Sequence, residues 1–307
     1  MASVDIAIPC YQYGRFLRQC VYSIQAQGIA DLRILIIDNA STDDSVAVAQ
    51  ELAARDPRIT VRARPINLGP QASYNEAIDW AAADYFMILC ADDVLPQGGL
   101  HRGVGIMEVD TSISFAFGRD IAFRDDAELS AIEMNTRTRW NVMDGTHFIA
   151  ERCTNPVATA SLLVRTKAQK QVGHYRPTLP YTDDLEMILR LATVGNVAIT
   201  DAIQGARRLH GANMADVFGQ SRAHDLAERE RAFESFFSRE GARLPAAKHL
   251  RQRAARWLAE RAYWWALRGM FSGRRREAAD LLAFALRRSP SMALIPPVNF
   301  LLRSARP

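Results

Sequence analysis

The first hundred residues alternate between short β-rich runs and stretches with helical spacing, and this alternation limits the fold more than any other feature. The β-rich runs are Val4–Ile8, Leu32–Ile37, Ile59–Ala63 and Tyr85–Cys90. The helix-like stretches between them are Phe16–Gln27, Asp44–Arg55 and Gln71–Ala83. Strands and helices at this spacing predict an α/β fold with a mostly parallel, Rossmann-like sheet covered by helices.

Polar loops follow three of these strands. They are residues 9–14 after the first strand, 38–43 after the second and 91–93 after the fourth. Ligands of parallel sheets bind beside the carboxyl ends of the strands, so we expect the three loops to converge on one ligand. The side-chain oxygens of Ser41 or Asp43 also fit the N-cap of the helix that follows.

The pattern is less regular after residue 100. We expect strands at Ile113–Gly118 and Val157–Val164, a loop-rich stretch after Asp125 and a helix at Asp183–Thr193. Beyond Ala215 the pattern is helical, with helices predicted at Gln220–Ser238, Ala246–Arg268 and Arg274–Arg287 and a turn at Gly269–Gly273.

The basic residues are concentrated in the C-terminal third. The chain has 38 basic and 34 acidic residues, a net charge of +4, but residues 215–307 alone carry 18 basic and 9 acidic residues, a net charge of +9. This region either contacts anionic lipid, binds a partner, or caps the fold with a solvated arginine face. Nucleic-acid binding is not expected, because no motif for it is present.

Composition and cysteine spacing indicate a globular protein of a reducing compartment. A chain that is 49% hydrophobic and 23% charged is not largely disordered. Its four cysteines form no C-x-x-C pair, which disfavours zinc and disulfide frameworks. No apolar run reaches the roughly 20 residues of a membrane span, and the N-terminus does not resemble a signal peptide. We expect a cytoplasmic location, peripheral at the inner face of the cell membrane if the basic helices bind lipid.

Short motifs in a fixed order carry a resemblance to a known family. The chain contains, in this order, Ala7-Ile8-Pro9-Cys10-Tyr11, Ile36-Ile37-Asp38-Asn39-Ala40-Ser41-Thr42-Asp43, Asn67-Leu68-Gly69 and Leu89-Cys90-Ala91-Asp92-Asp93, then Asn155-Pro156, Val172-Gly173, Thr182-Asp183-Asp184, Leu189-Arg190 and Leu209-His210-Gly211. Each motif is weak alone, but the ordered set resembles the nucleotide-sugar domain of family 2 glycosyltransferases, which have the GT-A fold. The resemblance covers roughly residues 4–213.

The resemblance implies a domain organisation. Residues 1–214 would form the GT-A glycosyltransferase domain, with a nucleotide-binding part at 1–100 and an acceptor part at 101–214. Residues 215–307 would form a basic helical C-terminal extension. The sugar and acceptor would be selected by the middle region, roughly Arg119–Asn155.

The resemblance assigns Pro9, Tyr11 and Asp38 to the nucleotide. An aromatic ring can stack on a flat base, and a carboxylate can accept a hydrogen bond from the base or ribose edge. The structural alternatives are that Tyr11 packs within its loop and that Asp38 caps a turn. Asn67 is a further candidate for substrate binding, although it also fits a simple connection from strand to helix.

Asp92 and Asp93 are the expected metal ligands. A divalent cation, Mg²⁺ or Mn²⁺, would neutralise the charge that grows on a departing nucleoside diphosphate. The family's Asp-x-Asp motif maps onto Cys90-Ala91-Asp92, so Cys90 replaces the first aspartate. A thiol is a poor ligand for Mg²⁺, which makes Asp92 the principal ligand.

A second acidic pair is the candidate for catalysis. The resemblance makes Asp184 the general base that removes the proton from the acceptor hydroxyl, with Asp183 as a substrate-binding residue. Acids at a helix N-terminus are also favoured by the helix dipole alone. His210 would approach the diphosphate or the metal, whereas Arg207 and Arg208 either hold phosphate charge or are solvated.

The function that the resemblance implies is inverting transfer of a sugar from a nucleotide-diphosphate donor, mainly a UDP-sugar, to an acceptor hydroxyl. The context would be bacterial surface polysaccharide or lipid-linked glycan synthesis. The alternative is a non-catalytic module that binds a nucleotide sugar or a partner, for which Cys90 is the only support. A sugar-1-phosphate nucleotidyltransferase is disfavoured, because residues 9–14 do not form a glycine-rich phosphate loop.

Overall fold

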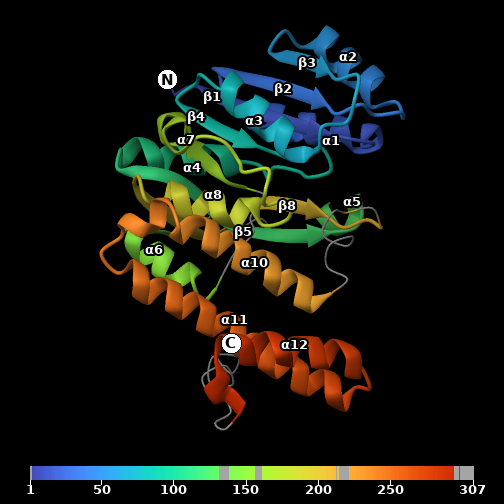
Figure 1. The fold of residues 1–307 in the computed structure, drawn as a ribbon. Helices are drawn as coiled ribbons and strands as arrows, with labels where there is room; N and C mark the ends of the chain where they lie inside the picture. Colours follow the sequence, from blue (N-terminus) through green and yellow to red (C-terminus); the bar gives the residue numbers. More distant parts are fainter. Residues whose placement is uncertain are drawn as a thin grey trace. The chain divides into compact units, whose positions relative to one another are not determined.

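The computed structural model describes residues 2–130, 138–155, 161–211, 213, 221–293 and 297. The chain divides into two compact units, each built from separate stretches. The first comprises Met1–Phe148, Ala158–Thr178 and Leu191–His210, and the second Ile149–Val157, Leu179–Arg190 and Gly211–Pro307. Figure 1 shows the elements of both units along the chain.

A mixed sheet forms the centre of the first unit. Its strands are β1 (Val4–Cys10), β2 (Leu32–Asp38), β3 (Ile59–Ala63), β4 (Tyr85–Ile88), β5 (Ile113–Phe123), β6 (Trp140–Met143), β7 (Leu163–Arg165) and β8 (Asn196–Arg208). Their order among the described residues is β3-β2-β1-β4-β7-β5-β8-β6. The first four strands are parallel, as are β5 and β8. The expected α/β fold with a mostly parallel sheet is therefore confirmed.

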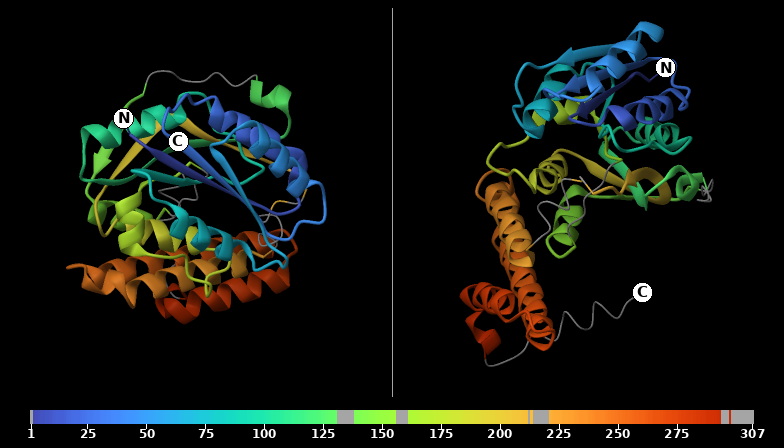
Figure 2. Two further views of the ribbon diagram at one scale, coloured as in Figure 1. Left: turned by 90° about the horizontal axis from the view of Figure 1, so that it is seen from above. Right: turned by 90° about the vertical axis from the view of Figure 1, so that its right-hand side faces the viewer.

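Helices flank this sheet (Figure 2). They are α1 (Gly14–Gln25), α2 (Ser45–Arg55), α3 (Pro70–Trp80), α4 (Gly99–Val109), α5 (Asp126–Ser130) and α7 (Thr166–Val172), while α6 (Gly145–Arg152) crosses between the units. The strands they cover are apolar on both faces, and six of the seven residues of β1 are buried. The helices expected before residue 100 are confirmed to within a few residues at each end.

A buried carboxylate ties three segments of the sheet together. Asp5 on β1 is fully buried. It accepts two hydrogen bonds from the Arg33 guanidinium on β2, at 2.8 and 2.6 Å. It also accepts the backbone N–H groups of Ala82 and Ala83, just before β4, at 2.7 and 2.9 Å. These four bonds fix the start of the parallel strands.

The structure adds to the sequence prediction at two places in the middle of the chain. Of the strand expected at Val157–Val164, residues 157–160 lie outside the described residues, as does Pro156 of the Asn155-Pro156 motif, and the described part contributes to the three-residue β7. The strand β8, which the sequence did not suggest, runs for 13 residues beside β5. Asp201, Gln204 and Gly205 interrupt the apolar pattern from which a strand would be predicted. The pairing of β8 with β5 is also irregular, because it contains register shifts.

The second unit is helical. It contains most of α8 (Asp183–Leu191), together with α10 (Arg222–Phe237), α11 (Ala247–Phe271) and α12 (Arg275–Arg288) and two 3₁₀ turns (Glu240–Arg243 and Pro290–Ala293). The helical C-terminal extension is confirmed, although Gln220 lies outside the described residues. The turn expected at Gly269–Gly273 is shorter, because α11 continues to Phe271 and the chain reverses at Gly273, whose φ is 79°. Among the described residues, none of the helices is both long and apolar enough to cross a membrane.

Candidate functional site

The loops after β1 and β2 are joined to each other. The Gln12 backbone N–H donates to Ser41 Oγ at 2.9 Å, and the Asn39 N–H donates to the Cys10 carbonyl at 2.9 Å. Gln12 and Ala40 both adopt left-handed backbone conformations, with φ of 60° and 64°. Such strain costs about 1–3 kcal/mol per residue and is concentrated at ligand sites, so it marks this edge of the sheet.

Asp38 is fully buried at the end of β2, and only one of its oxygens has a partner. Asp38 Oδ2 accepts the Ser41 N–H at 2.9 Å, which closes the turn after the strand. Asp38 Oδ1 is buried without a hydrogen-bond partner among the described residues. Leaving a buried polar atom unsatisfied costs about 1–3 kcal/mol, so the site is chemically incomplete without a donor.

The other candidate nucleotide residues lie on the same loops. Tyr11 is 45% exposed on the loop after β1, and Pro9 is half-buried at the end of that strand. Asn67 is exposed, and its side-chain oxygen accepts from Asn39 Nδ2 at 2.7 Å and from the Gly69 N–H at 2.8 Å. Asn67 therefore shapes the loop before α3. At the start of α2 the N-cap residue is Asp44, not Ser41 or Asp43 as expected, and its side chain makes no capping hydrogen bond. Asp43, one residue earlier, accepts the N–H of Ser45 at 3.0 Å.

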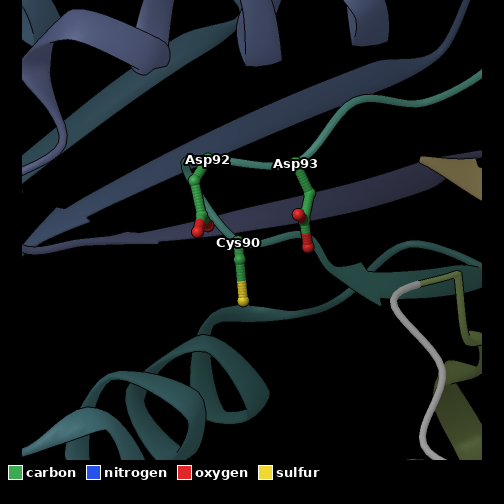
Figure 3. A group of neighbouring side chains, drawn as sticks. All are labelled: Cys90, Asp92 and Asp93. Carbon is green, nitrogen blue, oxygen red and sulfur yellow. The ribbon is translucent and has the colours of Figure 1, made fainter. Parts of the chain in front are cut away.

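Cys90, Asp92 and Asp93 form a compact group just after β4 (Figure 3). One ligand atom from each side chain lies within 4.8 Å of the others. The two aspartates are 7% and 5% exposed, and the tight turn is closed by the Asp93 N–H, which donates to the Cys90 carbonyl at 3.0 Å. Burial, with the neighbouring Asp92 carboxylate, raises the pKa of Asp93 well above its usual value. This group is the candidate cation site.

Arg208 at the end of β8 is hydrogen-bonded to the acidic turn that carries Asp92 and Asp93. Its backbone N–H donates to Asp93 Oδ1 at 3.1 Å and its guanidinium Nε to the Asp92 carbonyl at 3.3 Å. The guanidinium lies over the rings of Phe16 and Phe123, at 4.8 and 4.5 Å from their centroids. Arg208 is buried rather than solvated, while Arg207 is exposed. The sequence did not reveal this role, because it depends on the unexpected β8.

His210 contacts the acidic turn directly. His210 Nε2 lies 3.0 Å from Asp92 Oδ2. The imidazole packs against the rings of Tyr13 and Phe16, with centroid distances of 5.2 and 5.0 Å. Burial and the nearby Asp92 carboxylate raise the pKa of Tyr13, which sequence analysis did not single out. Of the predicted residues, Asp92 and Asp93 thus lie together, and His210 contacts Asp92.

The second acidic pair belongs to the second unit. Asp183 and Asp184 begin α8, where the Asp184 N–H donates to Asp183 Oδ1 at 2.9 Å and the Leu185 N–H donates to Asp184 Oδ1 at 2.6 Å. The alternative interpretation predicted such contacts, in which the two acids stabilise the N-terminus of a helix. Burial raises the pKa of Asp184, and the charge of Arg229 on α10 opposes that rise.

Helix α10 provides the surroundings of this pair. Thr182 Oγ1 donates to the Glu228 carbonyl at 2.9 Å, which attaches the start of α8 to α10. Arg229 Nε contacts both Asp225 oxygens at 3.0 Å. Burial raises the pKa of Tyr181, with Asp225 and Asp184 adding to that effect. Arg229 was not predicted from the sequence, since nothing in a single chain relates residue 229 to residue 184.

Comparison with known proteins now identifies the family. The model of "Glycosyl transferase family 2" matches residues 5–170, more than half of the chain. The chain belongs to this family of glycosyltransferases. A curated relative, a chondroitin synthase of Pasteurella multocida (strain Pm70), is 25% identical over 211 residues, which are 68% of this chain and 21% of that protein. The chain thus spans about a fifth of the length of the first curated relatives that it matches.

Solved structures support the fold. Residues 1–349 of S. aureus TarS align with a TM-score of 0.66 at 13% identity, covering 98% of this chain and 87% of that one. The same fragment in complex with UDP-GlcNAc aligns at 0.62 and 12% identity, covering 95% and 91% of the two chains. A mannosyltransferase of Pyrobaculum calidifontis with GDP-Man and Mn²⁺ aligns at 0.57 and 14% identity, covering 94% and 87%. The fold is GT-A, as the resemblance implied.

Proposed function

We propose that this chain is an inverting glycosyltransferase that moves a sugar from a nucleotide-diphosphate donor to an acceptor hydroxyl. The observation that carries the proposal is the family match combined with one sheet edge, where the loops after β1, β2 and β4 bring together an unsatisfied buried carboxylate and an acidic turn. In the sheet these three strands are neighbours, in the order β2-β1-β4.

The nucleotide would bind at the loops after β1 and β2. Asp38 Oδ1 is a buried acceptor that a base or ribose N–H or O–H would satisfy. Tyr11 presents an exposed ring for stacking beside Pro9, and Asn67 shapes the adjoining loop. UDP is the proposed nucleotide, supported by the structural neighbour that binds UDP-GlcNAc.

A divalent cation, Mg²⁺ or Mn²⁺, fits the acidic turn. Asp92 and Asp93 offer two carboxylates, and His210 adds an imidazole 3.0 Å from Asp92. When bound, the cation would neutralise charge on the diphosphate leaving group. Arg208 would hold the two aspartates in place through its contacts with their turn. The structural neighbour with Mn²⁺ supports this assignment.

Asp184 is the proposed general base, and Asp183 its partner in binding the acceptor. A base works in its charged form, and a pKa raised towards the working pH makes the carboxylate a better proton acceptor. Burial at the start of α8 supplies that rise. One direct displacement by the acceptor oxygen would invert the anomeric carbon.

The acceptor would be a growing glycan or a lipid-linked saccharide, since a matched relative is a polysaccharide synthase. The proposed location is the cytoplasm, and the inner face of the cell membrane if the basic helices contact lipid. The organisation proposed for it is a transferase domain at 1–214, with the nucleotide part at 1–100, and a basic helical region at 215–307 that contacts lipid.

The proposal is tested by donor binding and by turnover. A thermal-shift screen of nucleotide sugars with Mn²⁺ should give a higher melting temperature with one donor, and Asp92→Ala should lose the Mn²⁺-dependent part of that shift. Asp184→Asn should keep the donor shift and lose transfer by about 100-fold or more. Unchanged turnover in Asp184→Asn would contradict the base assignment. Donor binding without any hydrolysis or transfer would favour the non-catalytic module.

A further inference from the structure

Cys90 occupies the first position of the family's Asp-x-Asp motif, and its side chain lies with those of the two aspartates. In Figure 3 the Cys90 sulfur and both carboxylates extend to the same side of the turn after β4. The sulfur and one oxygen of each aspartate lie within 4.8 Å of one another. Cys90 is partly exposed, unlike the other three cysteines, which are buried. The sulfur is therefore placed as a ligand would be.

The distances fit one shared cation. Metal–sulfur bonds are about 2.3 Å and metal–oxygen bonds about 2.1 Å, so two such ligands on opposite sides of an ion are about 4.4 Å apart. The Cys90 sulfur and the two carboxylate oxygens all lie within 4.8 Å of one another, so small side-chain movements would let them share one ion. Two ligands at a right angle with bonds of about 2.1 Å are about 3 Å apart, and His210 Nε2 is 3.0 Å from Asp92 Oδ2.

The donor atoms decide which cation binds best. Magnesium prefers oxygen ligands and keeps several waters. A set of one sulfur and two carboxylates, with an imidazole beside one of the carboxylates, instead suits Zn²⁺, Co²⁺ or Fe²⁺, and affinities at such sites rise from Mn²⁺ to Co²⁺. We propose that Cys90 is a direct ligand of the cation and makes this site prefer a thiophilic first-row ion of the cobalt and zinc type over Mg²⁺. This inference rests on the proposed cation site.

Cobalt reports on this bond directly, because Co²⁺ bound to sulfur has a near-ultraviolet charge-transfer band that oxygen and nitrogen ligands do not give. The full chain would be titrated with CoCl₂, with and without UDP, and its absorption recorded. Wild-type protein should show the band, and Mg²⁺ should displace the cobalt only at a large excess. Cys90→Ser should lose the band and bind Co²⁺ about tenfold or more weakly. Cys90→Asp should also lose it, and its ratio of Co²⁺ to Mg²⁺ affinity should fall.

The controls separate this inference from the proposed cation site. Cys153→Ser changes a buried cysteine of the second unit and should keep the band. Cobalt that binds wild-type protein without the band, and no longer binds Asp92→Asn, would overturn the sulfur ligand and leave the cation site intact. A band that survives in Cys90→Ser would also overturn it. If the wild-type protein binds neither Co²⁺ nor Mn²⁺, with or without UDP, both proposals fail. Circular dichroism would verify that each variant is folded.

Discussion

At the scale of single residues, Asp184 shows how opposing effects set a proton affinity. Burial at the start of α8 raises the pKa of Asp184, while the hydrogen bond from the Leu185 N–H and then the Arg229 charge lower it. The charged form is the proposed base, so activity should be present above the raised pKa and fall as the pH drops through it. The position of that acid limb reports on the balance between burial and Arg229.

Arg229→Gln provides the test of this balance. Removing the positive charge should raise the pKa of Asp184 further, so the acid limb of the pH–rate profile should move to higher pH. The measurement is the initial rate of donor turnover across pH in the wild type and the variant. Arg239→Gln removes the same charge, but Arg239 is not among the groups that shift the pKa of Asp184, so the acid limb of this variant should stay where it is in the wild type. Identical profiles for wild type and Arg229→Gln would contradict the proposed electrostatic coupling.

The residues of the candidate site were easier to predict from the sequence than the residues that hold them in place. Asp38, Asp92 and Asp184 stand in short motifs that a single sequence displays. The supporting role of Arg208, which the sequence analysis named only for phosphate charge or solvation, and the role of Tyr13 were missed because both depend on three-dimensional packing. Arg208 contacts the acidic turn from a strand more than a hundred residues later, and the Tyr13 ring contacts the His210 ring. The roles of the predicted site residues stay predictions until the variants are measured.

At the scale of secondary-structure elements, regular hydrophobic patterns were predictable and irregular ones were not. The strand β3 was predicted at its observed bounds, Ile59–Ala63, because it is a short run with strong β propensity. The strand β8 was missed because its pairing with β5 outweighs the low strand propensity of Asp201 and Gly205. Tertiary pairing was the deciding influence there, and a single chain does not display it.

The start of the parallel strands depends on one carboxylate, and Asp5→Asn tests it. Asp5 is fully buried and accepts four hydrogen bonds, two of them from Arg33. An amide leaves Arg33 without its charge partner and turns one acceptor into a donor, so the free energy of unfolding should fall by about 2–4 kcal/mol. Urea denaturation measures this change. The matched variant Asp31→Asn, at an exposed position nearby, should change stability by less than about 0.5 kcal/mol. Equal effects of the two variants would refute the role of Asp5.

At the scale of the whole molecule, basic side chains and an exposed apolar side chain lie together at the end of the hairpin formed by α11 and α12. The C-terminal residues 215–307 carry the excess of positive charge. Phe271 at the turn between α11 and α12 is 92% exposed, and Arg274, Arg275 and Arg276 follow it, all exposed. An apolar side chain beside arginines suits the interface of an anionic bilayer.

Vesicle binding tests the proposed lipid contact. The full chain should sediment with vesicles that contain phosphatidylglycerol and not with neutral phosphatidylcholine vesicles, and added salt should weaken binding. Phe271→Ser should reduce the affinity by about thirtyfold, because a buried phenylalanine contributes about 2 kcal/mol. Val109→Ser removes another exposed apolar residue, on α4 and 85% exposed, and should leave binding unchanged. If both variants lost vesicle affinity equally, or if the protein bound both kinds of vesicle equally, the proposed lipid contact of the α11–α12 hairpin would be contradicted.

The path of the chain through its two units limits how such a gene can be recombined. The second unit draws on three separated stretches, and the hydroxyl of Thr182 in one of them is bonded to the backbone of Glu228 in another. A single crossover that replaced the 3′ end of the gene would combine the original Asp183 and Asp184 with C-terminal helices from another protein. A chimera that replaces residues 211–307 should therefore be more stable when residues 179–190 are replaced with it.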